Sequence, residues 1–350
     1  MMRKIFGAIW FLLKWVIVLV IGVEVISFIV ISASNFILYG NPREGGRAVY
    51  DAYTLFLQDS GVRKTEYNSR SENPEKNVAV WMFGGSTMRG PTPLDDKTLP
   101  SQLAKILNSR PGALRFTITN YGMDSFNSLL ETKYLQKLLI ENPEKPNIII
   151  FYDGANDAKY FAEYRTPYGH YGYRRVKALI ESYRKSRLGF LKPLNAAIFS
   201  SFTKELYDKI HQVEVPLEPD APGMKQLAVL TEERYDYVDK VARCYGADFF
   251  LFWQPSQWVE RCDIPESVRE KEKGLIVNSG RFATVRKNLT LPYLAIKGRL
   301  KDKPYFIDFQ NALCDRTIPA YTPDGVHLRP DGDAMVAEKM ASALLKRFSK

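Results

Sequence analysis

The sequence predicts an α/β fold with a parallel sheet of five strands, preceded by one apolar helix. Five short runs rich in Val, Ile and Phe are nearly continuous in their apolar residues. This pattern is typical of strands that are covered on both faces. Segments with helical periodicity separate the runs, as in chains that build a parallel sheet. The first forty residues form a separate, much more apolar stretch.

Composition sets the broad class of the chain. The protein has 350 residues, of which 45% are hydrophobic and 13% are aromatic, so it can bury one large or two modest cores and is not disordered. Its 49 Lys and Arg outweigh 39 Asp and Glu, giving a net charge of +10. The basic residues are dispersed and form no stripe or arm, so we expect no nucleic-acid partner.

The apolar N-terminal stretch predicts a membrane-spanning helix. From Trp15 to Ala33 the only charged residue is Glu24, and the length suits a single span. A cleaved signal peptide is the alternative, because small residues at 32–34 could serve a signal peptidase. The length of the apolar region and the charge at Lys14 favour a retained anchor. We expect Glu24 to be tolerated within the span rather than paired with another helix.

Charges around the span predict its orientation. Arg3, Lys4 and Lys14 precede it, whereas the basic residues that follow are offset by Glu44. The positive-inside rule then leaves the N-terminus in the cytoplasm and residues 41–350 outside it. The predicted organisation is a cytoplasmic stub and anchor at 1–40, a linker at 41–76 and an α/β domain at 77–350.

The elements of the α/β domain follow one another along the chain. The predicted strands are residues 78–83, 115–122, 147–153, 248–255 and 304–309, and helical periodicity occupies 101–109, 128–140, about 174–245 and about 266–287. Ligands and catalytic groups in such sheets gather beyond the carboxyl ends of the strands. Small and polar residues stand there: Gly84, Gly85 and Ser86; Asn120, Tyr121 and Gly122; Gly154, Ala155, Asn156 and Asp157; and, after the fifth strand, Asp324 and His327.

In this order the four blocks resemble those of the SGNH, or GDSL-like, hydrolases. The resemblance covers roughly residues 77–345 and implies a flavodoxin-like three-layer sandwich with serine esterase activity. Two positions depart from the family pattern. Gly85 stands where many members have Asp, and Ser125 stands where a second glycine is frequent in the second block.

Acyl transfer assigns a role to each block. Ser86 would be the nucleophile, His327 the base that takes its proton, and Asp324 the group that holds the imidazole. The backbone N–H groups of Ser86 and Gly122 and the amide of Asn156 would form the oxyanion hole. Gly85 would support this turn, and Asp157 would brace the Asn156 loop. Taken singly, Ser86 also suits a turn, His327 a capping loop and Asn156 an Asx-turn.

The chain between Asn156 and Asp324 is longer than two strands and their crossovers need, so we expect an insertion around 158–225. It opens with aromatic and basic residues, and Tyr160, Tyr164 and Arg165 are candidate contacts to a sugar or an acidic polymer. A lid packed by tyrosines is the alternative. The histidines at 170 and 211 have no metal-ligand company, so we expect no metal and no cofactor.

The three cysteines predict one disulfide. Cys244 and Cys262 flank the fourth strand and would stand roughly 20 Å apart, too far to bridge. Cys262 and Cys314 both follow strands that should be neighbours. We therefore expect these two to pair outside the cytoplasm while Cys244 stays a buried thiol.

The sequence thus predicts a membrane-anchored serine esterase that removes O-acyl groups, above all acetyl, from an envelope or secreted glycan. An O-acetyltransferase acting on a glycan would use the same acyl-enzyme, and a lipid esterase or thioesterase is a third reading. A glycan-binding or assembly protein without activity is the alternative from another class. The glycan, the acyl donor and the oligomeric state stay open.

Overall fold

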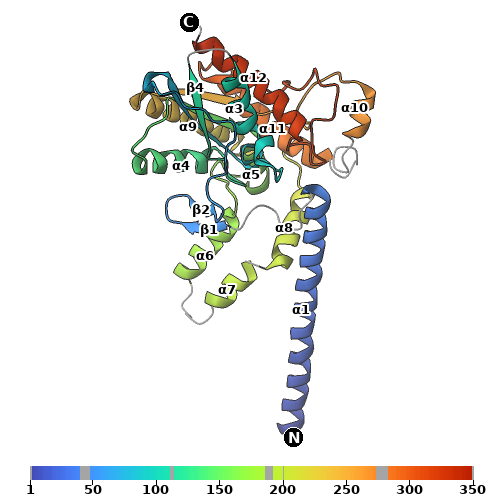
Figure 1. Ribbon diagram of the computed structural model, residues 1–350. Helices are drawn as coiled ribbons and strands as arrows, with labels where there is room; N and C mark the ends of the chain where they lie inside the picture. Colours follow the sequence, from blue (N-terminus) through green and yellow to red (C-terminus); the bar gives the residue numbers. More distant parts are fainter. Residues whose placement is uncertain are drawn as a thin grey trace. The chain divides into compact units, whose positions relative to one another are not determined.

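Figure 1 shows the computed structural model, which describes residues 2–39, 48–110, 114–185, 192–199, 201–272 and 283–348. The chain divides into two compact units. One consists of residues 1–44 and 172–215, and the other of residues 45–171 and 216–350. The larger unit carries the sheet, and the smaller unit carries the apolar N-terminal helix.

The sheet of the larger unit confirms the predicted fold class. Its five strands are all parallel and lie in the order β4 (Arg115–Asn120), β3 (Asn77–Gly84), β5 (Ile148–Asp153), β6 (Asp248–Trp253) and β7 (Phe306–Asp308). In chain sequence this is the flavodoxin-like order 2-1-3-4-5. All residues of the central strand β5 are buried, as its unbroken apolar sequence predicts.

Helices cover both faces of this sheet, giving three layers. Trp81 and Phe83 of β3 point into a core with α4 (Ser128–Glu141), α9 (Met224–Cys244) and α11 (Ala283–Leu300). Val80 and Met82, which alternate with them, point into the opposite core with α3 (Leu99–Ser109) and α12 (Pro330–Phe348). The period of two along a strand therefore sorts its side chains between the layers. Short elements complete the unit: η1 (Pro74–Lys76), α2 (Ser86–Arg89), η2 (Asp95–Lys97), α5 (Ala155–Tyr164) and α10 (Glu266–Lys271).

The expected linker is partly folded onto the larger unit. Strands β1 (Ala48–Asp51) and β2 (Leu55–Gln58) form an antiparallel hairpin. Phe56 meets the ring of Phe126 edge-on, with centroids 5.3 Å apart. Farther along, Arg63 donates hydrogen bonds to the carbonyls of Arg89, Gly90 and Thr92. Strands this short show little sequence periodicity, so the polar composition of the segment predicts a linker without regular structure. The contacts of Phe56 and Arg63 with the larger unit hold the segment in place.

The smaller unit consists of α1 (Met2–Tyr39), α6 (Tyr173–Lys185), α7 (Lys192–Phe199) and α8 (Phe202–Glu214). The stretch Phe6–Ile37 of α1 is long and apolar enough to cross a membrane, as an anchor or a signal sequence would be. The expectation that Glu24 is merely tolerated is wrong. Its carboxylate accepts hydrogen bonds from the backbone N–H groups of Phe202 and Thr203, at 2.6 and 3.0 Å.

The insertion is narrower than expected. Residues 158–171 and 216–225 belong to the larger unit, where α5 and α9 continue, so the inserted helices are α6, α7 and α8. The periodic segment 174–245 breaks into four helices within the described residues, α6 to α9. The predicted helix at 266–287 corresponds to α10 and the start of α11, and its residues 273–282 lie outside the described residues.

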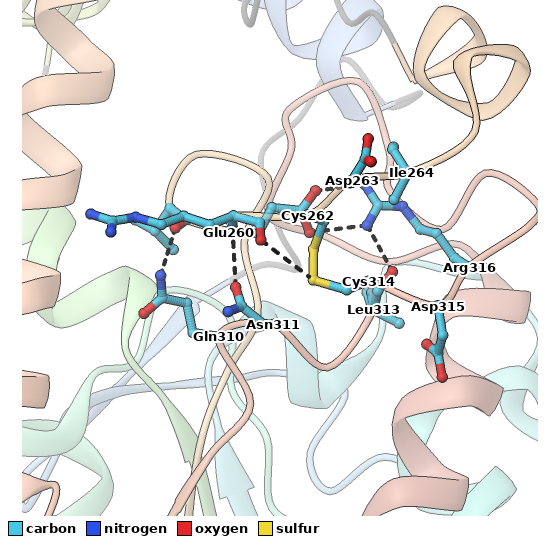
Figure 2. The surroundings of a disulfide bond; sticks show 12 residues. Glu260, Cys262, Asp263, Ile264, Gln310, Asn311, Leu313, Cys314, Asp315 and Arg316 are labelled. Atoms are coloured by element: carbon cyan, nitrogen blue, oxygen red, sulfur yellow. Dashed lines mark hydrogen bonds and ion pairs between the residues drawn. A yellow bond between two sulfur atoms is a disulfide. The ribbon is translucent and has the colours of Figure 1, made fainter.

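The disulfide between Cys262 and Cys314 is confirmed, with their Cα atoms 4.8 Å apart (Figure 2). The two loops that it joins follow the neighbouring strands β6 and β7, as predicted. Asn311 accepts a hydrogen bond from the N–H of Arg261 beside it. Cys244 is exposed, not buried, because it is the last residue of α9, where the helix ends at the surface.

Candidate active site

Ser86 stands where β3 turns sharply into α2. A Cβ atom on Gly84 would lie 2.6 Å from Cβ of Met88, and one on Gly85 would lie 2.3 Å from Nδ2 of Asn156. Only glycines allow this approach, so an Asp at position 85 would displace Asn156 from its place. The N–H of Ser86 is the first of α2 and has no acceptor within that helix.

His327 and Asp324 reach this serine from the loop between β7 and α12. Nε2 of His327 lies 2.7 Å from Oγ of Ser86, and its Nδ1 lies 2.5 Å from Oδ2 of Asp324. Oδ1 of Asp324 accepts hydrogen bonds from the N–H groups of Val326 and His327 and from the hydroxyl of Thr322. The chain from Asp324 to His327 therefore forms a turn that the carboxylate of Asp324 stabilises. The structure brings together the serine, imidazole and carboxylate that the sequence nominates.

The pKa values of His327 and Asp324 are shifted in the directions that favour an imidazolium beside a carboxylate. Burial lowers the pKa of His327, but the charge and hydrogen bond of Asp324 outweigh it and leave that pKa above its ordinary 6.5. Burial likewise raises the pKa of Asp324, and the interaction with His327 and two backbone N–H groups brings it below its ordinary value. The carboxylate thus stays ionised and can stabilise an imidazolium.

Asn156 follows β5 at the start of α5. Gly154, with φ of +134°, lets the chain turn there, since L side chains rarely adopt that conformation. Nδ2 of Asn156 donates one hydrogen bond to the carbonyl of Phe126, at 2.6 Å. An amide nitrogen carries a second hydrogen. The contact with Gly85 places that nitrogen beside the turn of the serine.

Gly122 does not offer the free donor that the sequence suggests. Its N–H donates to Oδ1 of Asn120 at 2.9 Å. A Cβ atom here would lie 2.5 Å from the backbone nitrogen of Arg89, so the glycine serves the close approach of this loop to α2. The prediction fails because the Asn side chain two residues earlier folds back onto the backbone, as in an Asx-turn.

Ser125, to which the sequence-based assignment of roles gave none, has an unusual backbone conformation. Its φ is +65°, in the left-handed region that favours glycine, and a glycine is frequent at this place in the family that the four sequence blocks resemble. A hydrogen bond from Tyr160 to its carbonyl, at 3.0 Å, holds it in this conformation. Strained residues of this kind cluster at functional sites.

Three buried carboxylates lie behind the Asn156 loop. Asp157 accepts hydrogen bonds from the hydroxyl and the N–H of Ser128, at 2.5 and 3.2 Å, and these join the start of α5 to the start of α4. Asp153 accepts one from Tyr235, and burial raises its pKa to about 7. Burial also raises the pKa of Glu131 well above its ordinary value. Glu131 could not be predicted from the sequence, because the segment SLLETKYL has the pattern of a helix with a solvent-exposed Glu.

The candidate substrate contacts differ in exposure. Tyr160 is 1% exposed, so its prediction as a contact is wrong: its ring packs in the core and its hydroxyl supports Ser125. Tyr164 stacks on Tyr160, and Arg165 ends α5 with its N–H on the carbonyl of Phe161; both are half-buried. Within the part of the chain that the structure describes, no group of His, Cys, Asp or Glu is arranged to hold a metal ion.

Comparison with known proteins adds a likeness of fold. The chain is similar to the acetyl xylan esterase AlAXEase, with a TM-score of 0.42 and 14% identity over 76% of this chain and 99% of that one. It is similar to the esterase EstA from Pseudoalteromonas sp., with a TM-score of 0.39 and 11% identity over 78% of this chain and 100% of that one.

A third solved structure, from Desulfitobacterium hafniense, is described as a lipolytic protein of the G-D-S-L family. Its TM-score is 0.38, with 13% identity over 76% of this chain and 99% of that one. The first two of these structures are described as esterases, and the third description names the family that the four sequence blocks resemble. No protein-family model and no curated protein matches the chain. The sheet order described above establishes the fold independently of these likenesses.

Proposed function

We propose that this chain is an SGNH-type serine esterase, held at a membrane by α1, that removes O-acyl groups, above all acetyl, from an envelope or secreted glycan. The observation that carries the esterase activity in this proposal is the continuous relay from Ser86 through His327 to Asp324, with hydrogen-bond distances of 2.7 and 2.5 Å. The serine can serve as nucleophile, the imidazole as the base that takes its proton, and the carboxylate as the group that orients the imidazole.

The reaction would proceed through an acyl-enzyme. Nε2 of His327 takes the proton of Ser86 as Oγ attacks the ester carbonyl carbon. The tetrahedral intermediate collapses, the C–O bond to the sugar breaks, and the imidazolium gives its proton to the departing sugar oxygen. Water then attacks the acyl-serine, with His327 again as base, and releases the carboxylic acid. A positioned base of this kind contributes typically about 10²- to 10⁴-fold.

The oxyanion of that intermediate needs donors fixed in advance. We assign the N–H of Ser86 and the side-chain amide of Asn156 to this role. The N–H of Ser125 takes the place expected of Gly122, because the left-handed turn there is held from outside by Tyr160. Loss of one such donor costs on the order of 10²-fold or more in turnover.

Retention of α1 is supported by its packing. The helix continues without a break through residues 32–34, where a signal peptidase would cut, and Ile31 and Asn35 on either side are buried. The positive charges of Arg3 and Lys4, which precede the apolar stretch Phe6–Ile37, favour an N-terminus in the cytoplasm and an esterase unit outside it.

The test uses the full chain in detergent micelles with 4-nitrophenyl acetate, butyrate and octanoate, beside Ser86→Ala. Acetylated oligosaccharide is added as competing substrate and acceptor. We expect acetate-selective release that disappears in Ser86→Ala. Acetyl gain by the sugar would assign a transferase, and preference for octanoate a lipid esterase. Release that is unchanged in Ser86→Ala would refute the nucleophile.

A further inference from the structure

The inserted helices expose apolar side chains and pair their charged ones. On α6, α7 and α8 five apolar side chains are 38 to 58% exposed: Ile180, Leu194, Ile198, Phe202 and Ile210. The charged side chains of the same helices are 24 to 43% exposed where they form ion pairs. A helix bundle in water buries most of its large apolar side chains.

The paired charges face a common cleft. Arg175 pairs with Glu205 at 3.0 Å, and Lys204 pairs with Asp208 at 2.5 Å. These residues belong to α6 and α8, and three of them line a cleft of about 190 Å³ together with Phe199 of α7. Two ion pairs therefore lie at this cleft, and none of the five exposed apolar side chains lines it.

The same unit contains the apolar helix α1, and α8 packs against its C-terminal part. Buried residues of α1 recur on one face at Ser27, Ile31 and Asn35. Glu24 accepts the first two N–H groups of α8 and the hydroxyl of Thr203, which compensates its charge with the positive end of a helix. Phe202 meets Phe28 edge-on, with centroids 5.0 Å apart.

The length of α1 explains why part of it needs to be covered by other helices. The 38 residues of α1 make a helix of about 57 Å, whereas the hydrocarbon core of a bilayer is about 30 Å thick. About half of α1 must therefore leave the hydrocarbon. The residues from 6 to 21 are exposed throughout, and burial begins only at residue 22.

We propose that α6, α7 and α8 lie in the lipid interface on the outer side of the membrane, with their exposed apolar side chains among the acyl chains of that leaflet. The apolar surface of α8 adjoins that of α1 at Phe28, so one lipid layer covers both. The inference rests on the proposed retention of α1 as an anchor. It gives the insertion a membrane-binding role in place of the sugar contacts expected from its aromatic and basic residues.

The experiment measures lipid contact with the full chain in vesicles of phosphatidylethanolamine and phosphatidylglycerol. In a Cys244→Ser background, single cysteines replace Leu194, Ile198 or Ile210 and carry a nitroxide. Relaxation by oxygen, which enters lipid, is compared with relaxation by a water-soluble nickel chelate. Matched controls are Lys177→Cys on the polar side of α6 and Ile140→Cys, an exposed apolar residue of the larger unit. Two sites on α7 guard against the failure of one variant to fold.

We expect an oxygen-to-nickel ratio severalfold higher at 194, 198 and 210 than at 177 and 140. Ratios equal to that at 140 would place these helices in water and overturn the proposal. Protection from both reagents would overturn it too, because a protein would then cover them. A nitroxide at Val18 distinguishes a failure of this inference from a failure of the proposed anchor. Lipid contact at 18 without lipid contact at 198 refutes only this inference. Absence of lipid contact at both positions refutes the anchor.

Discussion

The hydrogen bonds of Asp324 define a sharp test of the proposed relay. In Asp324→Asn we expect the side-chain oxygen to occupy the present position of Oδ1, because three hydrogen-bond donors point to that position. They are the N–H groups of Val326 and His327 and the hydroxyl of Thr322. The amide nitrogen then faces Nδ1 of His327 and donates to it. The imidazole must carry its proton on Nε2, which points at Ser86 and can no longer accept a proton.

The expected loss follows from this tautomer. In serine hydrolases with the same arrangement, the corresponding change lowers kcat by about 10⁴-fold, which corresponds to about 5.5 kcal/mol of activation free energy. The assay is 4-nitrophenyl acetate hydrolysis by the full chain in micelles, with thermal unfolding measured on the same samples. Because the turn keeps its three hydrogen bonds, we expect the unfolding midpoint to change little.

Thr322→Val is the matched control. It removes one hydrogen bond to Oδ1 and leaves the contact between Oδ2 and His327. A net contribution of about 0.5–1.5 kcal/mol limits its effect to roughly tenfold. If Asp324→Asn kept more than a tenth of the activity, His327 would not depend on this carboxylate and the relay would be refuted. A loss of activity matched by a loss of folding would assign Asp324 a structural role alone.

Three further predictions follow from the same structure. First, kcat/KM should rise with pH through a midpoint above 6.5, because the neutral form of His327 is the base and its pKa is raised; a midpoint below 6.5 would contradict this. Second, Cys262→Ser with Cys314→Ser should lower the free energy of unfolding by about 4 kcal/mol, given a separation of 52 residues, as measured by urea titration. Third, the folded state holds a proton on Asp153 up to about pH 7, whereas the unfolded state releases it near 3.8, so stability falls as pH rises through this window. Asp153→Asn should flatten that fall in urea titrations at several pH values, and an unchanged slope would exclude Asp153 as its source.

The sheet was predictable because its strands are covered on both faces. A run such as NIIIFYD has no polar face that could mislead, and β5 occupies residues 148–153 of the predicted 147–153. Helix α11 was harder, since Pro292 lies inside it and the predicted helix stopped at 287. The β1–β2 hairpin was missed for another reason. Four-residue strands give no usable period, and Phe56 is ordered by packing against Phe126, a residue far along the chain.

Within the site, residue type and strand end were enough to bring Ser86, Asp324 and His327 together. They were not enough for the oxyanion donors, because a donor depends on where one N–H points. The N–H of Gly122 is taken by Asn120, and the special backbone conformation lies instead at Ser125. Tyr160 shows the same limit. Its sequence neighbourhood is polar and aromatic, yet the ring is buried and its hydroxyl donates a hydrogen bond to the carbonyl of Ser125.

Glu24 marks the point at which local patterns stop being informative. An isolated acid in an apolar helix can be tolerated or paired, and the choice depends on residues that lie 178 and 179 positions away. The polar N-terminus of α8 attracts a carboxylate because its first N–H groups lack acceptors within the helix. Glu24 in turn fixes the register of α8 along α1, since a shift by one turn would leave both the acid and the helix end without partners. An apolar helix and an inserted helical segment, which the sequence presents as unrelated features, thereby become parts of one folded unit.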